Sequence, residues 1–168
     1  MAYQILGPTV YPQPIAETST TKKLPLGTIV RAVDPTYGVG EFIYLLGVAS
    51  TIVGSVASYN ATTGQTTLAV GGKRLPRCVA ISMSANVASQ YGWYQIGGVA
   101  AVAKKATSSF ASGIALGLNS ASSAGFVIAS GTGKEIQGFL LAAVASAKSD
   151  VLTCLCVIDR PHIQGRIT

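Results

Sequence analysis

The feature that most constrains the fold of this chain is its division into short β-rich runs separated by glycine, asparagine, serine and proline. No stretch sustains the period of an amphipathic helix, so the pattern is typical of strands. The predicted strands are residues 28–34, 41–48, 55–60, 65–70, 78–84, 92–102, 113–118, 126–129, 136–144 and 151–158. About ten short strands predict an all-β domain, either a β-sandwich or a β-barrel, with a jelly roll as one such arrangement.

The side chains in the run 78–84 alternate in size, which indicates how this strand faces its neighbours. Val79, Ile81 and Met83 share one face, and the residues between them are small. We expect the large residues to face the core. The small, nearly uncharged face is suited to close approach by another sheet or subunit.

The last predicted strand, 151–158, is apolar on both sides. Leu155 and Val157 lie on one face, and the other face carries Leu152, Cys154, Cys156 and Ile158. A strand in contact with water would keep one polar face. We therefore expect both faces of this strand to be covered.

Charged residues are scarce, at 11% of the chain, and the mean hydropathy is +0.46. Soluble proteins carry roughly 25% charged residues, so this chain either enters a membrane or has much of its surface covered by partners. The longest apolar stretch, 42–57, contains serine, threonine and glycine and is shorter than the roughly 20 residues of a spanning helix. The first residues also lack the basic start of a secretory leader. We expect partners, no membrane, and a protein that stays where it is made.

The first 26 residues differ from the rest of the chain. Pro8, Pro12, Pro14 and Pro25 exclude a helix and a central strand there. The segment is nevertheless too apolar for a solvated tail, because it contains Tyr3, Ile5, Leu6, Val10, Tyr11 and Ile15. We predict an extended arm over 1–26 that lies on the protein's own surface or on a neighbour's. A single all-β domain over 27–168 is expected to fold without it.

Twelve Lys and Arg residues against six Asp and Glu residues give a net charge of +6, which favours an acidic partner. These cations fall in predicted loops or in the arm, at Lys22, Lys23, Lys73, Arg74, Arg77, Lys104, Lys105, Arg160 and Arg166. A nucleic-acid interface would place stacking aromatics among them, but Trp93 and Tyr94 lie inside an apolar run. Docking onto an acidic protein surface, or simple solubility of the loops, explains the charges better than nucleic acid.

Catalytic and metal-binding chemistry has little to build on. The only histidine, His162, stands near the chain end, and no two carboxylates have a spacing typical of an acid–base pair. Cys154 and Cys156 could supply half of a zinc site, but only Cys78 and His162 could complete the four ligands. Three cysteines are better explained as small core residues in a reducing compartment. We expect no enzyme, no metal and no cofactor.

Two stretches combine aromatic residues and glycines in an order that strand patterning does not require. The first is Val30-Arg31-Ala32-Val33, followed by Tyr37-Gly38-Val39-Gly40-Glu41-Phe42-Ile43-Tyr44-Leu45 and Gly47. The second is Val79-Ala80-Ile81-Ser82-Met83, followed by Ser89-Gln90-Tyr91-Gly92-Trp93-Tyr94-Gln95-Ile96 and Gly98. Over about residues 28–100 the chain thus resembles the head decoration, or cement, proteins of tailed bacteriophages. Neither the arm nor the part after residue 100 shares this likeness.

The resemblance implies a non-catalytic virion protein, made in the host cytoplasm, that binds the major capsid protein on the outside of an assembled head. It also implies a homo-oligomer, a trimer rather than a dimer, that stabilises the shell. In this interpretation the arm and the basic loops make the contacts. The candidate contact residues are Tyr3, Ile5, Leu6, Tyr11, Lys22, Lys23, Lys73, Arg74, Arg77, Lys104, Lys105, Arg160, His162 and Arg166.

Two other classes of function stay open. A carbohydrate-binding module of a head fibre or tail would present a solvent-facing Trp93 flanked by Asn, Asp or Gln. A hydrolase would have to assemble its site from residues far apart in the sequence, with His162 as the most plausible catalyst.

Overall fold

The computed structural model describes residues 4–6, 12–71, 77–105, 109–111, 113–118, 124–130, 135–143 and 152–163. Its strands are β1 (Gln4–Leu6), β2 (Thr18–Ser19), β3 (Ile29–Asp34), β4 (Gly38–Leu46), β5 (Val56–Tyr59), β6 (Thr66–Leu68), β7 (Arg77–Ser82), β8 (Tyr91–Ala103), β9 (Leu116–Leu118), β10 (Val127–Ala129), β11 (Ile136–Leu141) and β12 (Thr153–Ile163). The residues described contain no helix, which confirms the all-β prediction. None of them, accordingly, belongs to a helix that could cross a membrane.

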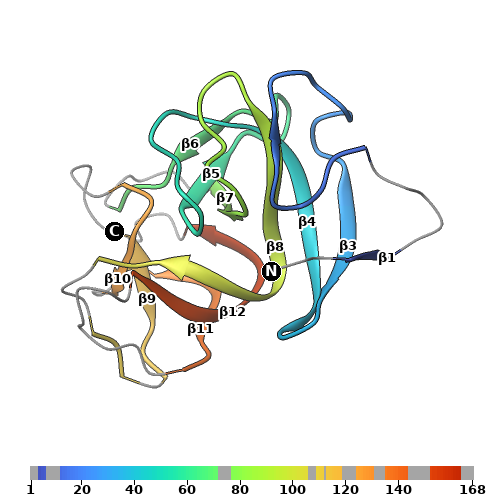
Figure 1. Ribbon diagram of the computed structural model, residues 1–168. Helices are drawn as coiled ribbons and strands as arrows, with labels where there is room; N and C mark the ends of the chain where they lie inside the picture. Colours follow the sequence, from blue (N-terminus) through green and yellow to red (C-terminus); the bar gives the residue numbers. More distant parts are fainter. Residues whose placement is uncertain are drawn as a thin grey trace.

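Most strands belong to one antiparallel sheet that curls into a half-barrel (Figure 1). Its order is β1-β3-β4-β8-β12-β7-β5-β6, with β11 beside β12 and β2 beside β8. Strands β9 and β10 form a small second sheet. The two sequence stretches that resemble decoration proteins become β3–β4 and β7–β8. They meet in the centre of the large sheet, because β8 pairs with both β4 and β7.

The long strand β8 organises the sheet because its two halves have different partners. Residues 91–97 pair with β4, and residues 97–103 pair with β12. In Figure 1 the strand runs down the middle of the molecule and then turns aside. Gly98, just after the change of partner, has a φ of +94°. This left-handed conformation favours glycine.

The turn in β8 is held by contacts that leave no room for a larger residue. A Cβ atom on Gly98 would lie 2.6 Å from the carbonyl oxygen of Val39. Beneath the turn, the buried amide of Gln95 donates to the carbonyl oxygens of Gly97 and Val99, each at 3.0 Å. The glycine and the glutamine together fix where β8 leaves β4 and joins β12.

Three clusters of buried side chains fill both sides of the curled sheet. The largest contains Val79 and Ile81, as the alternation predicts, and it is covered by the small second sheet through Leu116, Leu118 and Val127. The other two lie on opposite faces of β4 and the first half of β8, because neighbouring residues of β4 contribute to different clusters. Each of these strands is therefore central and apolar on both faces, as expected for a buried strand.

The described part of the predicted arm packs on the protein's own core. Ile15 is buried in the same cluster as Tyr44 and Trp93. Gln13 is buried too: its backbone oxygen accepts from the Trp93 indole at 3.0 Å, and its side-chain oxygen accepts from the Tyr44 hydroxyl at 2.7 Å. Strand β1 also pairs with β3, and β2 pairs with β8. That 27–168 folds without this segment stays a prediction, and removal of the segment would uncover Tyr44 and Trp93.

Candidate functional site

The structure disperses the basic residues that sequence analysis offered as contact residues. Lys22 and Lys23 are exposed on the segment before β3, and Lys105 is exposed after β8. Arg77 of β7 and His162 of β12 are also exposed. Their strands pair, with Ile163 opposite Arg77 and His162 opposite Cys78. The predicted contact residues Tyr3, Tyr11, Lys73, Arg74 and Arg166 lie outside the described residues, and for Ile5 and Leu6 only the backbone is described.

Lys104 directly follows β8, outside the named strands, and it is not exposed as a contact residue would have to be. It is 0% exposed, its amide donates to the carbonyl oxygen of Leu152, and it forms a parallel bridge with Val127. Chain segments distant in sequence cover it, so its ammonium group is not presented to a partner by this chain.

Trp93 is not the exposed aromatic that a carbohydrate-binding module would need. Its ring is fully buried and packs edge-on against Tyr44, with ring centroids 5.0 Å apart. The neighbouring Tyr94 is buried as well. These aromatics are core residues, which removes the version of the carbohydrate hypothesis based on Trp93.

Of the three thiols, Cys78 is exposed, which differs from the expected core position, and the other two are buried. Cys154 and Cys156 are buried on one face of β12 with their sulfur atoms 3.9 Å apart. The hydrogen bond between the two thiols lowers the pKa of Cys154 and raises the pKa of Cys156. Over the described ranges, no three His, Cys, Asp or Glu side chains gather where they could hold a metal ion. His162 of β12 is exposed, with Gln137 of β11 and Cys78 of β7 as its cross-strand partners.

The face of β8, β12 and β11 that points away from the largest core cluster is apolar and exposed. We call it the outer face. Leu140 and Val157 lie opposite each other, at 57% and 41% exposure, and Val157 lies opposite Val99. Ala101 and Leu155 extend the same face and are partly buried. The expectation that both faces of this strand are covered is thus wrong for the isolated chain, which leaves one of them open.

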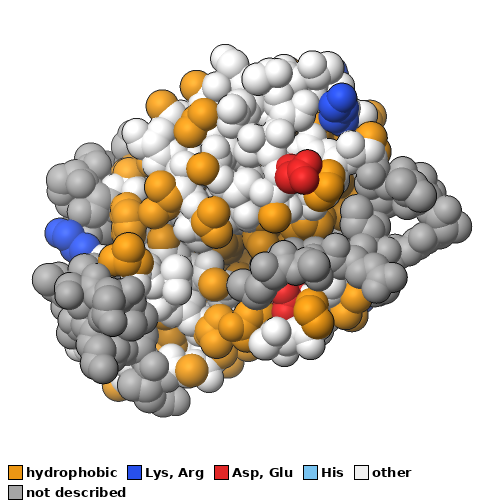
Figure 2. Space-filling model, in the orientation of Figure 1, with side chains coloured by type: hydrophobic (Ala, Val, Ile, Leu, Met, Phe, Trp, Pro, Cys, Tyr) orange, Lys and Arg blue, Asp and Glu red, His pale blue; other side chains and the backbone are white. Residues whose placement is uncertain are grey.

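The surface in the view of Figure 2 has the same character. Hydrophobic side chains are spread over it, and only a few charged ones stand between them. Such a surface is typical of proteins whose surface is covered in an assembly.

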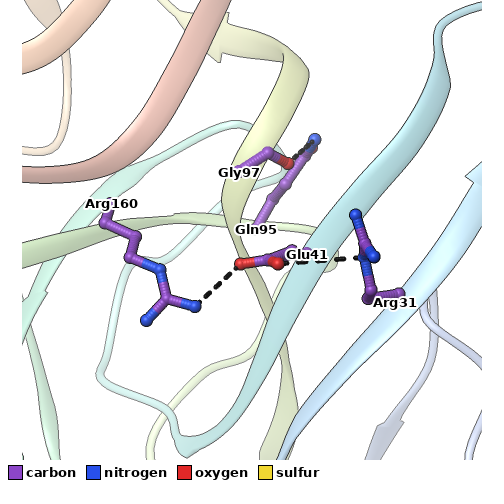
Figure 3. Close-up of polar contacts among 5 residues, drawn as sticks. All are labelled: Arg31, Glu41, Gln95, Gly97 and Arg160. Carbon is purple, nitrogen blue, oxygen red and sulfur yellow. Dashed lines mark hydrogen bonds and ion pairs between the residues drawn. The ribbon is translucent and has the colours of Figure 1, made fainter.

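A polar cleft lies at the end of the outer face, where β8 turns. Cross-strand pairing places Glu41 of β4, Gly97 of β8 and Asp159 of β12 in one row. The glycine leaves a gap between the two carboxylates, and a cavity of about 350 Å³ opens there. Arg31 and Arg160 stand at its margins (Figure 3).

Glu41 lies between the two arginines. Its Oε1 atom is 3.8 Å from Nε of Arg31, and its Oε2 atom is 3.1 Å from Nη2 of Arg160. Both guanidinium groups are exposed and the carboxylate is partly buried, so each ion pair contributes little to stability, about 0–1 kcal/mol. Sequence analysis named Arg160 but missed Arg31, Glu41 and Asp159. The sequence feature that pointed to the cleft was the Gly97-Gly98 pair inside an apolar strand. Glycine within a strand marks a bulge or a close approach of another group.

Comparison of the chain with models of known protein families, with curated proteins and with solved structures finds no match.

Proposed function

We propose that this chain is a structural protein of a bacteriophage head that binds the outside of the capsid as an oligomer, a trimer rather than a dimer, and stabilises the shell. The resemblance to decoration proteins motivates the proposal. The observation that carries it is the outer face, where exposed Leu140 and Val157 lie side by side with Val99 of β8. Together they form an apolar surface suited to another protein.

Three further features support a binding role. Trp93 and Tyr44 are core residues rather than exposed rings that could stack on a sugar. The exposed basic residues Lys22, Lys23 and Arg77 are available to an acidic shell. The scarcity of charge in the whole chain fits a protein that is covered by neighbours. Attachment through many copies adds avidity, so each contact can be modest.

The test is co-sedimentation of the purified chain with empty capsids assembled without it, taken from the phage that encodes it, across a salt series. We expect saturable binding at a fixed number of copies per capsid. The share of binding lost at high salt reports the contribution of the basic residues, because exposed charges are screened. Failure to bind at every salt concentration would overturn the proposal.

A matched pair of variants separates the outer face from general stickiness. Val157→Lys places a charge in the outer face, and Val53→Lys places one at another exposed valine outside it. We expect Val157→Lys to lower the number of bound copies and Val53→Lys to leave it unchanged. Equal effects of the two variants would remove the outer face from the proposal.

A further inference from the structure

The polar cleft is surrounded by departures from regular sheet geometry. Arg160 has a φ of +40°, rare for a residue with a side chain, and it directly precedes Pro161. The pairing of β4 with β8 shifts register between Glu41 and Phe42, and that of β11 with β12 shifts around Gly138. A strained residue of this kind is destabilising, and such residues concentrate at ligand sites.

The irregularity at Arg160 has a direct consequence for the cleft. Successive side chains in a regular strand point to opposite faces, so Asp159 and Arg160 would normally be separated by the sheet. Here both line the cavity, and Arg160 reaches Glu41 at 3.1 Å. Bulges re-aim side chains in this way. The strained backbone therefore places a donor group and an acceptor group side by side.

The cleft retains unused hydrogen-bonding capacity. A guanidinium group has five N–H donors, and Arg31 and Arg160 each contact a single carboxylate oxygen. Asp159 is exposed, and among the described residues no partner is found for its carboxylate. Gly97 and Gly98 have no side chains, so a ligand can approach the backbone of β8 closely.

The balance of charge decides which ligand fits. Two guanidinium groups and two carboxylates line the cavity and their charges cancel, so neither a phosphate nor a cation gains a net attraction. Donors and acceptors alternate around it, which suits an uncharged molecule carrying many hydroxyl groups. A cavity of about 350 Å³ is at the lower end of the range for small-molecule sites.

We propose that this cleft binds a neutral saccharide, with Asp159 and Glu41 accepting from its hydroxyl groups and Arg31 and Arg160 donating to them. The site lies at the end of the outer face and does not involve Trp93. Its affinity as a single site is expected in the millimolar range, because the cleft is shallow and has no aromatic ring in its lining.

The test is titration of the isotope-labelled full chain with glucose, galactose, mannose, rhamnose and N-acetylglucosamine, followed by amide NMR. These sugars sample different arrangements of axial and equatorial hydroxyl groups. We expect at least one to shift the backbone amides of Gly97, Gly98 and Arg160. Asp159→Ala should weaken that binding roughly tenfold or more, as expected for a lost hydrogen bond to a charged group.

Glu17→Ala is the matched control, since it removes an exposed carboxylate outside the cleft lining and should leave the affinity unchanged. Absence of shifts with all five sugars at high millimolar concentration would overturn the inference, as would shifts confined to residues outside the cleft. A tetraglutamate peptide is titrated in parallel. Shifts of the cleft amides with this peptide alone would make the cleft an anion site and overturn the saccharide assignment. Capsid co-sedimentation measures the proposed function separately, so the two can fail independently.

Discussion

At the scale of single residues, Tyr94 illustrates how a buried polar group links stability to pH. Its ring is fully buried, and its hydroxyl lies 3.1 Å from the amide group of Asn86 and 3.5 Å from the hydroxyl of Thr66. Burial raises the pKa of this hydroxyl above its usual 10.0, although its hydrogen bonds oppose the shift. The folded state therefore resists ionisation that the unfolded chain accepts.

Because the folded pKa of Tyr94 is raised, its contribution is fully present below pH 10.0 and is lost as the pH rises through the folded pKa. Tyr94→Phe should be less stable than the parent near pH 8, by about 1 kcal/mol for each lost hydrogen bond. At about pH 11 the stability difference between Tyr94→Phe and the parent should shrink or reverse, since phenylalanine does not ionise. Urea unfolding at the two pH values measures this. An unchanged difference would show that Tyr94 is not linked to alkaline unfolding.

The residues that sequence analysis placed correctly are those governed by local alternation. Val79 and Ile81 face the core because their positions in a strand decide their side. The exposure of Lys104 was mispredicted for a different reason. The chain segment around Leu152 that contacts it is far away in sequence, as is Gln13, which accepts from the indole of buried Trp93. Neither composition nor periodicity carries information about such contacts.

At the scale of elements, the turn in β8 depends on Gly98. Gly98→Ala would combine two penalties, a left-handed φ and a Cβ atom 2.6 Å from the Val39 carbonyl oxygen. Gly27→Ala carries only the first, because its φ is +85° and its Cβ atom would meet nothing within 4 Å. We expect Gly27→Ala to cost about 1–2 kcal/mol in unfolding free energy and Gly98→Ala clearly more. Chemical denaturation compares them, and equal costs would mean that the backbone relieves the contact.

The segment before β3 makes a second prediction at this scale. Ile15→Ala should lower the unfolding free energy by about 2–5 kcal/mol, as for a buried aliphatic side chain in any core. Ile52→Ala, at an exposed isoleucine, should change it by at most about 0.5 kcal/mol. Thermal or urea unfolding provides the measurement. A small effect of Ile15→Ala would mean that this segment lies on the surface of the protein without contributing to its core.

Strand positions were predictable from the sequence, but their irregular ends were not. The last strand was expected to stop at 158, and β12 continues to Ile163 past Pro161. Proline is tolerated in a strand at a bulge, and this bulge arises from pairing with β11 around Gly138. The cleft depends on that bulge and on a row of residues from β4, β8 and β12. Without the pairing order, the scattered carboxylates Glu41 and Asp159 could not be brought together.

At the scale of the whole molecule, the all-β architecture follows from the density of turn residues and from the absence of helical periodicity. The order of the strands does not follow, because β12 pairs with the second half of β8 and with the start of β7, and both of these strands are distant from β12 in sequence. This order creates the outer face, which joins β8, β12 and β11. A surface that spans three strands depends on the strand order, so the sequence of any single strand cannot predict it.

The outer face makes the prediction that concerns the molecule as an assembly. If copies of the chain associate through it, Leu140→Lys should shift the protein towards the monomer, because a charge buried between subunits is costly. Stability of the monomer should change by at most about 0.5 kcal/mol, since Leu140 is exposed in the single chain. Sedimentation velocity gives the mass, and Val53→Lys serves as a control with the same gain of charge at a site of similar exposure. A Leu140→Lys variant that keeps the parent's oligomeric mass would place the contacts between copies elsewhere. The outer face would then be left for the capsid alone.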